Sequence, residues 1–522
     1  MFIRKPLKRP LANGEPLFHN DHGRPRTRRE FIAQGFRAGT ATVVGTSMLG
    51  LFANPRMAAA ELSQQIKDEC GIGIAGAGKI PFICFDLAGG ASIAGSNVLM
   101  GKSGGQMDFL STAGYSKLGV PGNMLPTDPA FVNTELGLAF HSDSGFLRGI
   151  QQSTSMMTRM QINGAIIAAR SENDTGNNPH NPMYGIHKAG ANGSLLPLIG
   201  SQSTESGGNS MAPMNLINPE VRPTKIDRPS DAKGLVDVGD LTSILNQTDA
   251  VSVMEAVQRI SDAKMNSVST GLGSSAENDI RKLVRCGYAK SADIIDTYGD
   301  PTILDPGQDP EIVGNTGIFT EEEFRSNREF QKTASVMKLA VNGFAGAGTI
   351  TMGGYDYHTG ERATGERRDL LAGRCMGACL EYAARMNKPL MLYVFSDGSV
   401  SSNGTLDDSE DGRGKGVWTG DNQQTAASFF LVYNPGGRPS LYQDRNPTGI
   451  QTGFQIGFMR ADASVETASS PAANNVNQLV QTVLLNYMQL NGDRGRFAST
   501  FVGHGLGNTA SQDRLLAFNP LV

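Results

Sequence analysis

The stretch PLMLYVFSDG, residues 389–398, indicates the fold class of the chain. Its first seven residues are continuously apolar rather than alternating, which is typical of a strand buried on both faces of a parallel sheet. Residues 367–386 come directly before it and carry apolar residues at helical spacing. A helix that leads into a buried strand is typical of an α/β fold. Asp397 follows the strand, so we expect a carboxylate at its carboxyl end.

The same pattern recurs along the rest of the chain. Further apolar, β-rich runs lie at residues 80–85, 164–169, 348–352 and 428–433. Further helices are predicted at residues 249–263, 275–285 and 474–490. Strands that alternate with helices in this way predict an α/β protein with three αβα layers and a mainly parallel sheet.

The middle of the chain has a different composition. Residues 171–240 are rich in Asn, Gly, Ser and Pro, which predicts a long surface loop with little regular structure. Residues 241–330 look helical and are predicted to cap the sheet. We therefore predict that residues 61–522 form one α/β domain with a helical and loop insertion at about 171–330.

The net charge and the cysteine content of the chain argue against two classes of protein. A net charge of −4 indicates that the chain is not a general nucleic-acid binder. Its five cysteines are too few and too scattered for a disulfide scaffold. Cys375 and Cys379 share one face of a predicted helix. We interpret them as two small buried residues, with a metal-binding pair as the alternative.

The first 60 residues have the order of an export signal. Residues 27–32, TRREFI, fit the twin-arginine pattern of paired arginines, a spacer and two apolar residues. The weakly apolar stretch 35–52 is too short for a stable membrane span. Residues 57–60, MAAA, suit a signal peptidase, and we expect cleavage near Ala60. The alternative is a disordered basic tail. We expect transport by the twin-arginine translocation machinery to the periplasm or beyond, in the folded state.

Two glycine-rich segments resemble nucleotide-binding motifs without meeting their requirements. Residues 71–76 spell G-x-G-x-x-G, but a strand is predicted after the motif instead of before it. Residues 95–103 have one residue too many between the glycines of a phosphate-binding loop. We therefore expect no nucleotide cofactor.

Acidic residues and one histidine stand next to the predicted strands. Asp86 and Asp397 each end a strand. Asp356 and His358 follow a third strand, and Asp421 lies before a fourth. Each acid alone is also typical of a turn or a helix cap. Functional groups of parallel sheets collect at the carboxyl ends of the strands, so the repeated placement favours one shared site.

The order of these elements resembles the DUF1501 family, twin-arginine-exported proteins of the alkaline-phosphatase/sulfatase-like superfamily. The most specific shared motif is GGYDYH at residues 353–358. The other shared elements are the signal, the acidic turn after the first strand, NPHN at 178–181, SDG at 396–398, the turn at Asp421 and NPGG at 434–437.

The resemblance implies a three-layer αβα fold with a metal site at the edge of the sheet. In that superfamily two divalent cations polarise a phosphate or sulfate ester and activate a Ser or Thr nucleophile. We therefore expect a divalent metal ion, whether zinc, manganese, magnesium or calcium. The candidate nucleophiles are Ser171 and Thr175. The candidate metal ligands are Asp86, His180, Asp356, His358, Asp397 and Asp421.

The chain departs from the family pattern at several positions. Pro179 stands where the family has Ser before the histidine, and Asn422 replaces a ligand histidine. Asp397 replaces the usual Glu, and the arginine expected two residues after it is absent. Two functions follow: an exported metal-dependent hydrolase of small phosphate or sulfate esters, or a non-catalytic binding or assembly protein of the cell envelope with the same fold.

Overall fold

The computed structural model describes residues 78–171, 178–236, 301–444 and 454–522, together with scattered positions between 253 and 286. The chain divides into two compact units. One unit, Gly73–Leu235 with Pro301–Val522, holds all the strands named below. The other unit, Met1–Ile72 with Val236–Asp300, includes the predicted signal and the predicted helices at 249–263 and 275–285. These predictions lie wholly or mostly outside the described residues.

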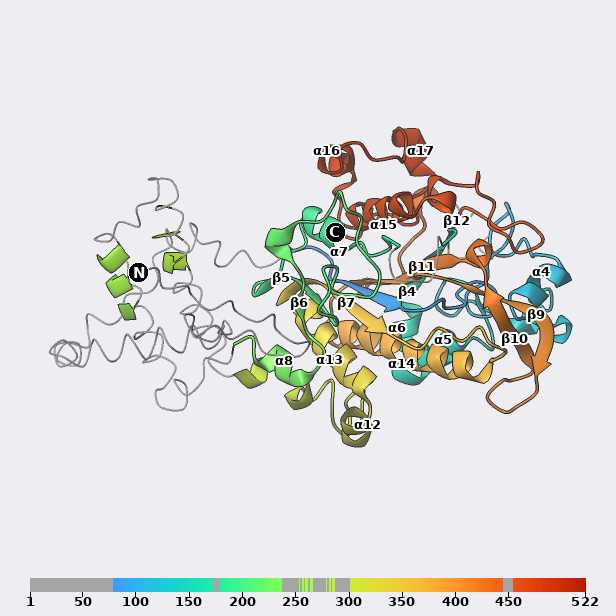
Figure 1. Ribbon diagram of the computed structural model, residues 1–522, viewed down its shortest axis with the longest axis horizontal. Coiled ribbons are helices and arrows are strands. Elements are labelled where there is room, and N and C mark those ends of the chain that lie inside the picture. Colours follow the sequence, from blue (N-terminus) through green and yellow to red (C-terminus); the bar gives the residue numbers. More distant parts are fainter. Residues whose placement is uncertain are drawn as a thin grey trace, which may run out of the picture. The chain divides into compact units, whose positions relative to one another are not determined.

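The larger unit is built on an eight-stranded sheet (Figure 1). Seven strands run parallel, and β11 alone is antiparallel to both of its neighbours. The strand order across the sheet is β12 (Phe454–Ile456), β4 (Ile162–Ala168), β11 (Ala427–Tyr433), β8 (Leu390–Ser396), β1 (Phe82–Leu87), β7 (Ala345–Met352), β5 (Leu196–Gly200), β6 (Thr224–Lys225).

The predicted fold class is confirmed in this unit. All five predicted strands are present, as β1, β4, β7, β8 and β11, and every residue in them is buried. The helices predicted at 367–386 and 474–490 are α14 (Ala363–Arg385) and α15 (Val476–Leu490). Burial on both faces explains why these strands are continuously apolar.

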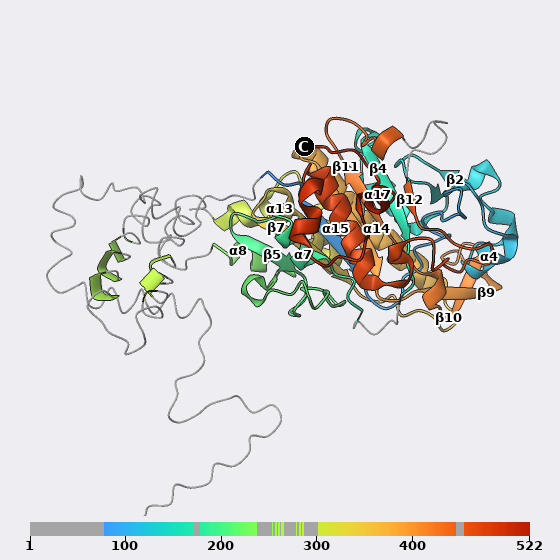
Figure 2. The same cartoon turned by 90° about the horizontal axis from the view of Figure 1, so that it is seen from above.

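Helices cover both faces of the sheet (Figures 1 and 2). On one face α7 (Met183–Lys188) and α15 pack against a core that includes Phe82, Cys84 and Phe395. On the other face lie α13 (Arg328–Val341), α14 and α5 (Gly145–Ser153). The sheet is thus a middle layer between two helical layers, consistent with the αβα prediction.

The prediction of a loop from 171 to 240 is wrong in part. The segment contains α7 and two strands of the main sheet, β5 and β6. Both strands are short, and β5 carries Pro197 near its start and Gly200 at its end. These residues are typical of loops, and proline in a strand is tolerated mainly at its beginning or at an edge. Composition therefore concealed two strands that extend the sheet beyond β7.

Smaller elements surround the sheet. They include α4 (Thr112–Lys117), α6 (Met156–Met160), α8 (Pro229–Lys233), α12 (Glu321–Ser326), α16 (Phe497–Thr500), α17 (Thr509–Asp513), and the antiparallel pairs β2 (Val132–Asn133) with β3 (Phe140–His141) and β9 (Val400–Asp407) with β10 (Lys415–Asp421). Within the described ranges, no helix has both the length and the apolarity needed to span a membrane.

Candidate functional site

The strand ends that carry the predicted acids meet at one edge of the sheet. β1 lies between β7 and β8 and runs parallel to both, with Asp86 opposite Thr351 and Phe395. β11 is antiparallel to β8, so its amino end lies at this same edge. Residues after β1, β7 and β8 and residues before β11 therefore face a common region, as the sequence predicted.

Asp86 and Asp397 form a buried carboxylate pair at this edge. Oδ2 of Asp86 accepts the backbone N–H groups of Asn209 and Ser210, at 2.7 and 2.8 Å, and Oδ1 accepts the Ser210 hydroxyl at 3.1 Å. Asp397 accepts the Gly89 N–H on Oδ1 and the Asn209 side-chain amide on Oδ2, both at 2.9 Å. Asn209 thus connects the two carboxylates.

The pair is electrostatically unfavourable when both members are ionised. Burial is the main reason that the pKa of Asp86 is raised to about 7; the negative charge of Asp397 contributes to this rise, and the hydrogen bonds from Ser210 and Asn209 oppose it. A carboxyl group with a pKa near 7 is partly protonated at neutral pH. The pair therefore carries less than two full charges under ordinary conditions.

Two glycines allow the backbone to approach this pair. At Gly208 a β-carbon would stand 2.6 Å from Oδ2 of Asp86. At Gly89, which has a φ of +122°, a β-carbon would stand 2.7 Å from the backbone nitrogen of Asp356. The segment 207–210, GGNS, was interpreted from sequence only as part of a loop. Its paired glycines before Asn and Ser were the available signal that backbone donors approach a buried group here.

His180 lies on the same face of the sheet as Asp86. Its ring stacks on Phe395, with the ring centres 5.9 Å apart, and Phe395 is the partner of Asp86 in the β1–β8 ladder. The side chain is buried, and neither ring nitrogen has a hydrogen-bond partner among the described residues. Burial lowers the pKa of His180 to about 4, so the ring is neutral. A buried polar group without a partner is costly and uncommon in folded proteins.

Ser171, one of the two predicted nucleophiles, is engaged with the backbone. Its hydroxyl donates to the main-chain oxygen of Asp397, which also accepts the Asn178 side-chain amide at 2.9 Å. The hydroxyl proton is therefore directed at a carbonyl oxygen and not at a general base. Thr175, the other predicted nucleophile, lies outside the described residues.

Asp356, His358 and Asp421 form a second, exposed group. Nε2 of His358 lies 2.7 Å from Oδ1 of Asp356 and 3.8 Å from Oδ1 of Asp421. The Asp356 side chain is 71% exposed and that of Asp421 is 46% exposed. Gly89 packs against the backbone of Asp356 and donates to Asp397, so this group adjoins the buried pair. The predicted ligands therefore fall into two neighbouring groups.

The divalent metal implied by the family resemblance stays a prediction. In the parts of the chain that the structure describes, no three or more His, Cys, Asp or Glu side chains are placed to hold a metal ion. The oxygens of Asp86 and Asp397 already accept hydrogen bonds, and His180 bonds to neither carboxylate. Asn422 caps a short 3₁₀ helix. Cys375 and Cys379 are free and buried in α14, as the simpler interpretation predicted.

Two hollows flank this edge at the amino end of α15. One, of about 290 Å³, is lined by Arg170, Ser171, Gln423, Asn474 and Val476. The other, of about 440 Å³, is lined by Pro179, Met211, Ala212, Met214, Asn215 and Asn477. Ser171 borders the first hollow, and the residue before His180 borders the second. A small ligand in the first hollow would contact Ser171, whereas His180 is buried and lines neither hollow.

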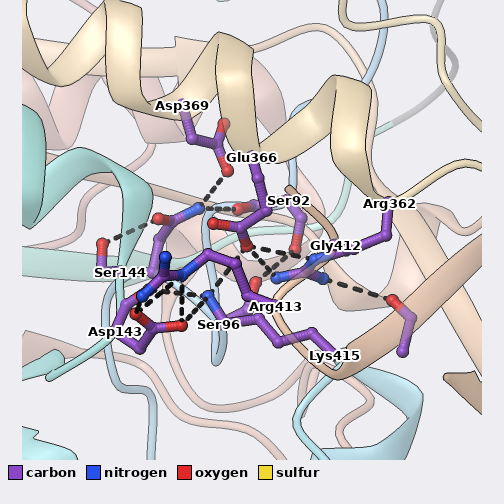
Figure 3. Close-up of polar contacts among 12 residues, drawn as sticks. Ser92, Ser96, Asp143, Ser144, Arg362, Glu366, Asp369, Gly412, Arg413 and Lys415 are labelled. Carbon is purple, nitrogen blue, oxygen red and sulfur yellow. Dashed lines mark hydrogen bonds and ion pairs between the residues drawn. The ribbon is translucent and has the colours of Figure 1, made fainter. Parts of the chain in front are cut away.

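A separate charge cluster joins α14 to the β9–β10 hairpin and to the loop before α5 (Figure 3). Glu366 is 4% exposed and lies 2.6 Å from an Arg362 nitrogen and 2.8 Å from the Lys415 nitrogen. Lys415 also lies 3.2 Å from Asp143, which accepts hydrogen bonds from Arg413. Although burial opposes it, Arg362 and Lys415 hold the pKa of Glu366 below its usual value. Sequence analysis missed this cluster because Arg362 and Glu366, which are one helical turn apart, meet Lys415 and, through it, residue 143, which both lie far away in the chain.

Asp369 lies one turn after Glu366 on the buried side of α14 (Figure 3). Its Oδ2 accepts the Asn97 side-chain amide at 2.7 Å, and no partner is present for Oδ1 within the described residues. Burial raises the pKa of Asp369 to about 8, and the charge of Glu366 adds to the rise. The nearby Tyr355 and Tyr357 are buried as well. Asp369 is therefore a mostly protonated acid at neutral pH.

Comparison with known proteins gives no further assignment: no family model, no curated protein and no solved structure matches the chain.

Proposed function

We propose that the chain is an exported protein of the alkaline-phosphatase-like fold that binds a small polar ligand at the carboxyl edge of its sheet without hydrolysing it. The observation that carries this proposal is the buried imidazole of His180, whose two nitrogens have no partner within the described ranges. A neutral imidazole offers one donor and one acceptor. His180 lines neither hollow, so a ligand in the hollow beside Pro179 must displace the side chains that cover the ring before it can bond to the ring. Bonding there would remove the cost of leaving the ring unpaired.

The state of the acids and of Ser171 supports binding over hydrolysis. Asp86 and Asp397 accept hydrogen bonds from the protein itself, and the Ser171 hydroxyl donates to a main-chain oxygen. Nucleophilic catalysis needs a hydroxyl next to a base or a metal ion. The donation of the Ser171 hydroxyl to a main-chain oxygen, and Asn422 in the position where the resembled family has a histidine, both favour binding over hydrolysis.

Export to an oxidising compartment is part of the proposal. The twin-arginine pattern at residues 27–32 is its main support. Cys286 is disulfide-bonded, and structural disulfides persist mainly in secreted and periplasmic proteins. We therefore propose a periplasmic or extracellular location, with the translocation machinery and an envelope ligand as partners.

A metal-dependent phosphatase or sulfatase is the second candidate. The contact between His358 and Asp356, with Asp421 beside them, favours it, because imidazole and carboxylate are suitable zinc or manganese ligands. Under this alternative the three residues would close around a cation in the exposed group.

The two candidates are separated by one set of measurements on the purified full chain. Metal content is determined by mass spectrometry, and release of the aryl group from aryl phosphate and aryl sulfate esters is followed with and without added zinc, manganese, magnesium or calcium. Binding is followed as a rise in the melting temperature with inorganic phosphate, sulfate or the same esters. The variants are His180→Phe, His358→Ala and, as a control for histidine replacement, His187→Phe.

For the binding proposal we expect no stoichiometric metal, no turnover and a ligand-dependent rise in melting temperature that His180→Phe abolishes and His187→Phe retains. Turnover that requires added metal and is lost in His358→Ala would establish the second candidate instead. Absence of any stabilisation by these ligands would reject a phosphate-like or ester-like ligand at His180.

A further inference from the structure

The short helix α6 exposes an unusual group of methionines. Met156, Met157 and Met160 are 64%, 69% and 56% exposed. Methionine is among the residues most often buried in folded proteins, so three exposed copies within five residues need an explanation. A single exposed apolar side chain is ordinary, but this group is contiguous.

The opposite face of α6 is polar and fixed to the protein. Thr158 donates its hydroxyl to Glu381 at 2.7 Å, and the Ser155 backbone N–H donates to the same carboxylate at 2.9 Å. Arg159 donates to Glu135 at 2.7 Å. Glu381 belongs to α14, and α6 lies beside this long helix (Figure 1). Most surface helices bury their apolar face and expose their polar face. In α6 the hydrogen-bonding side chains face the protein, and the methionine side chains face the solvent.

The helical spacing places Met160 next to both Met156 and Met157 on the surface of α6. Met160 is four residues after Met156 and three after Met157, and side chains at both spacings are neighbours on a helix surface. Each methionine side chain has three rotatable bonds, so the sulfurs can adjust around a common centre. The anchored inner face keeps the backbone in place while they do so.

We propose that Met156, Met157 and Met160 form a binding site for a soft monovalent metal ion, Cu(I) or its analogue Ag(I). Thioether sulfur is a soft ligand that selects Cu(I) over hard divalent cations, which prefer oxygen and nitrogen. The three free cysteines at 84, 375 and 379 are buried and do not offer a competing exposed sulfur site. The site is separate from the strand-edge acids and from the function proposed for them.

The test is a Cu(I) titration of the purified full chain under anaerobic, reducing conditions, in competition with a chromogenic Cu(I) chelator. The decisive variant carries Met156→Leu, Met157→Leu and Met160→Leu. Leucine keeps the size and apolarity of each side chain and removes only the sulfur. The matched control carries Met211→Leu and Met214→Leu, which change two other exposed methionines, 40% and 79% exposed.

We expect one equivalent of Cu(I) per chain, an affinity at least tenfold lower in the triple variant, and no change in the double variant. X-ray absorption of the bound copper should show sulfur ligands alone, and Zn(II) should not displace it. Failure of the folded chain to hold Cu(I), or retention of full affinity by the triple variant, would overturn the proposal. Unchanged melting temperatures of both variants ensure that any loss reflects the sulfurs.

Discussion

The protonation of a single buried acid, Asp369, should be visible in the pH dependence of stability. Its folded-state pKa is raised to about 8, whereas an aspartate in an unfolded chain has a pKa of about 3.9. Between these values the folded protein holds a proton that the unfolded chain has released. Stability from this group is therefore complete below about pH 4 and falls as pH rises toward 8, by up to about 1.4 kcal/mol per pH unit.

We predict that Asp369→Asn removes this slope. The amide is neutral at every pH, and its oxygen can still accept the Asn97 hydrogen bond. Glu366, Arg362 and Lys415, the charged groups that act on Asp369, are unchanged. Urea unfolding should show that the stability advantage of the variant over the wild type grows by about 3.5 kcal/mol between pH 5 and pH 8.

The control for this prediction is Asp408→Asn, which neutralises an exposed aspartate in the β9–β10 turn. It should leave the pH profile close to that of the wild type. If Asp369→Asn gives the same pH slope as this control, Asp369 does not bind a proton on folding.

At the scale of elements, the charge cluster of Figure 3 fastens the β9–β10 hairpin to α14. Glu366 of α14 holds Arg362 of the helix start and Lys415 of β10, and all three side chains are almost fully buried. Removing one partner of a buried ion pair leaves the other charge buried and uncompensated, which costs about 3–5 kcal/mol. We predict a loss of this size for Glu366→Gln, measured by urea unfolding at pH 7, together with faster amide exchange in β10.

A matched surface pair joins the same two elements. Arg367 of α14 and Asp411 of the hairpin turn lie 2.6 Å apart with exposures of 58% and 55%. Exposed pairs are worth about 0–1 kcal/mol, so Asp411→Asn should cost less than 1 kcal/mol. If Glu366→Gln and Asp411→Asn lower the free energy of unfolding by the same amount, burial of the cluster does not add to its stabilising effect.

The helices and strands that could be predicted from sequence are those whose apolar residues follow an unbroken strand or helix pattern. β8 and α14 were predicted because burial on both faces makes β8 wholly apolar and gives α14 an apolar face. β5 and β6 were missed because they are short and carry loop-forming residues. A sheet order cannot be deduced from such patterns, so the antiparallel direction of β11 was not predicted.

In the candidate site, too, some features could be predicted from sequence and others could not. Asp86 and Asp397 were expected to meet because each follows a strand, and they do lie close together. Sequence analysis could not predict that Asn209 and Ser210 would donate to Asp86, because a loop 123 residues away in the chain supplies those donors. The separation of Asp356 and His358 from the buried pair depends equally on loop paths, which have no periodic signal.

For the whole molecule, the strand order bears on the proposed export in the folded state. β1 pairs with β7 and β8, so Phe82 faces Ala347 on one side and Met391 on the other. The centre of the sheet therefore cannot form until nearly 400 residues have been made, and contacts so distant in sequence form slowly. The proposed route carries folded proteins and would suit this topology, because transport would follow completion of the sheet.

We predict that the paired arginines at residues 28 and 29 direct the chain to that route. Arg28→Lys with Arg29→Lys keeps the positive charge of the segment and removes the guanidinium pair. The precursor should then remain in the cytoplasm, whereas the wild type should appear in the periplasmic fraction with a new amino terminus near Ala60. Arg24→Lys with Arg26→Lys, which alters two arginines just upstream, should be exported normally. Export of the Arg28/Arg29 variant at the wild-type level would contradict the twin-arginine assignment, and the requirement for folding before transport would lose its basis.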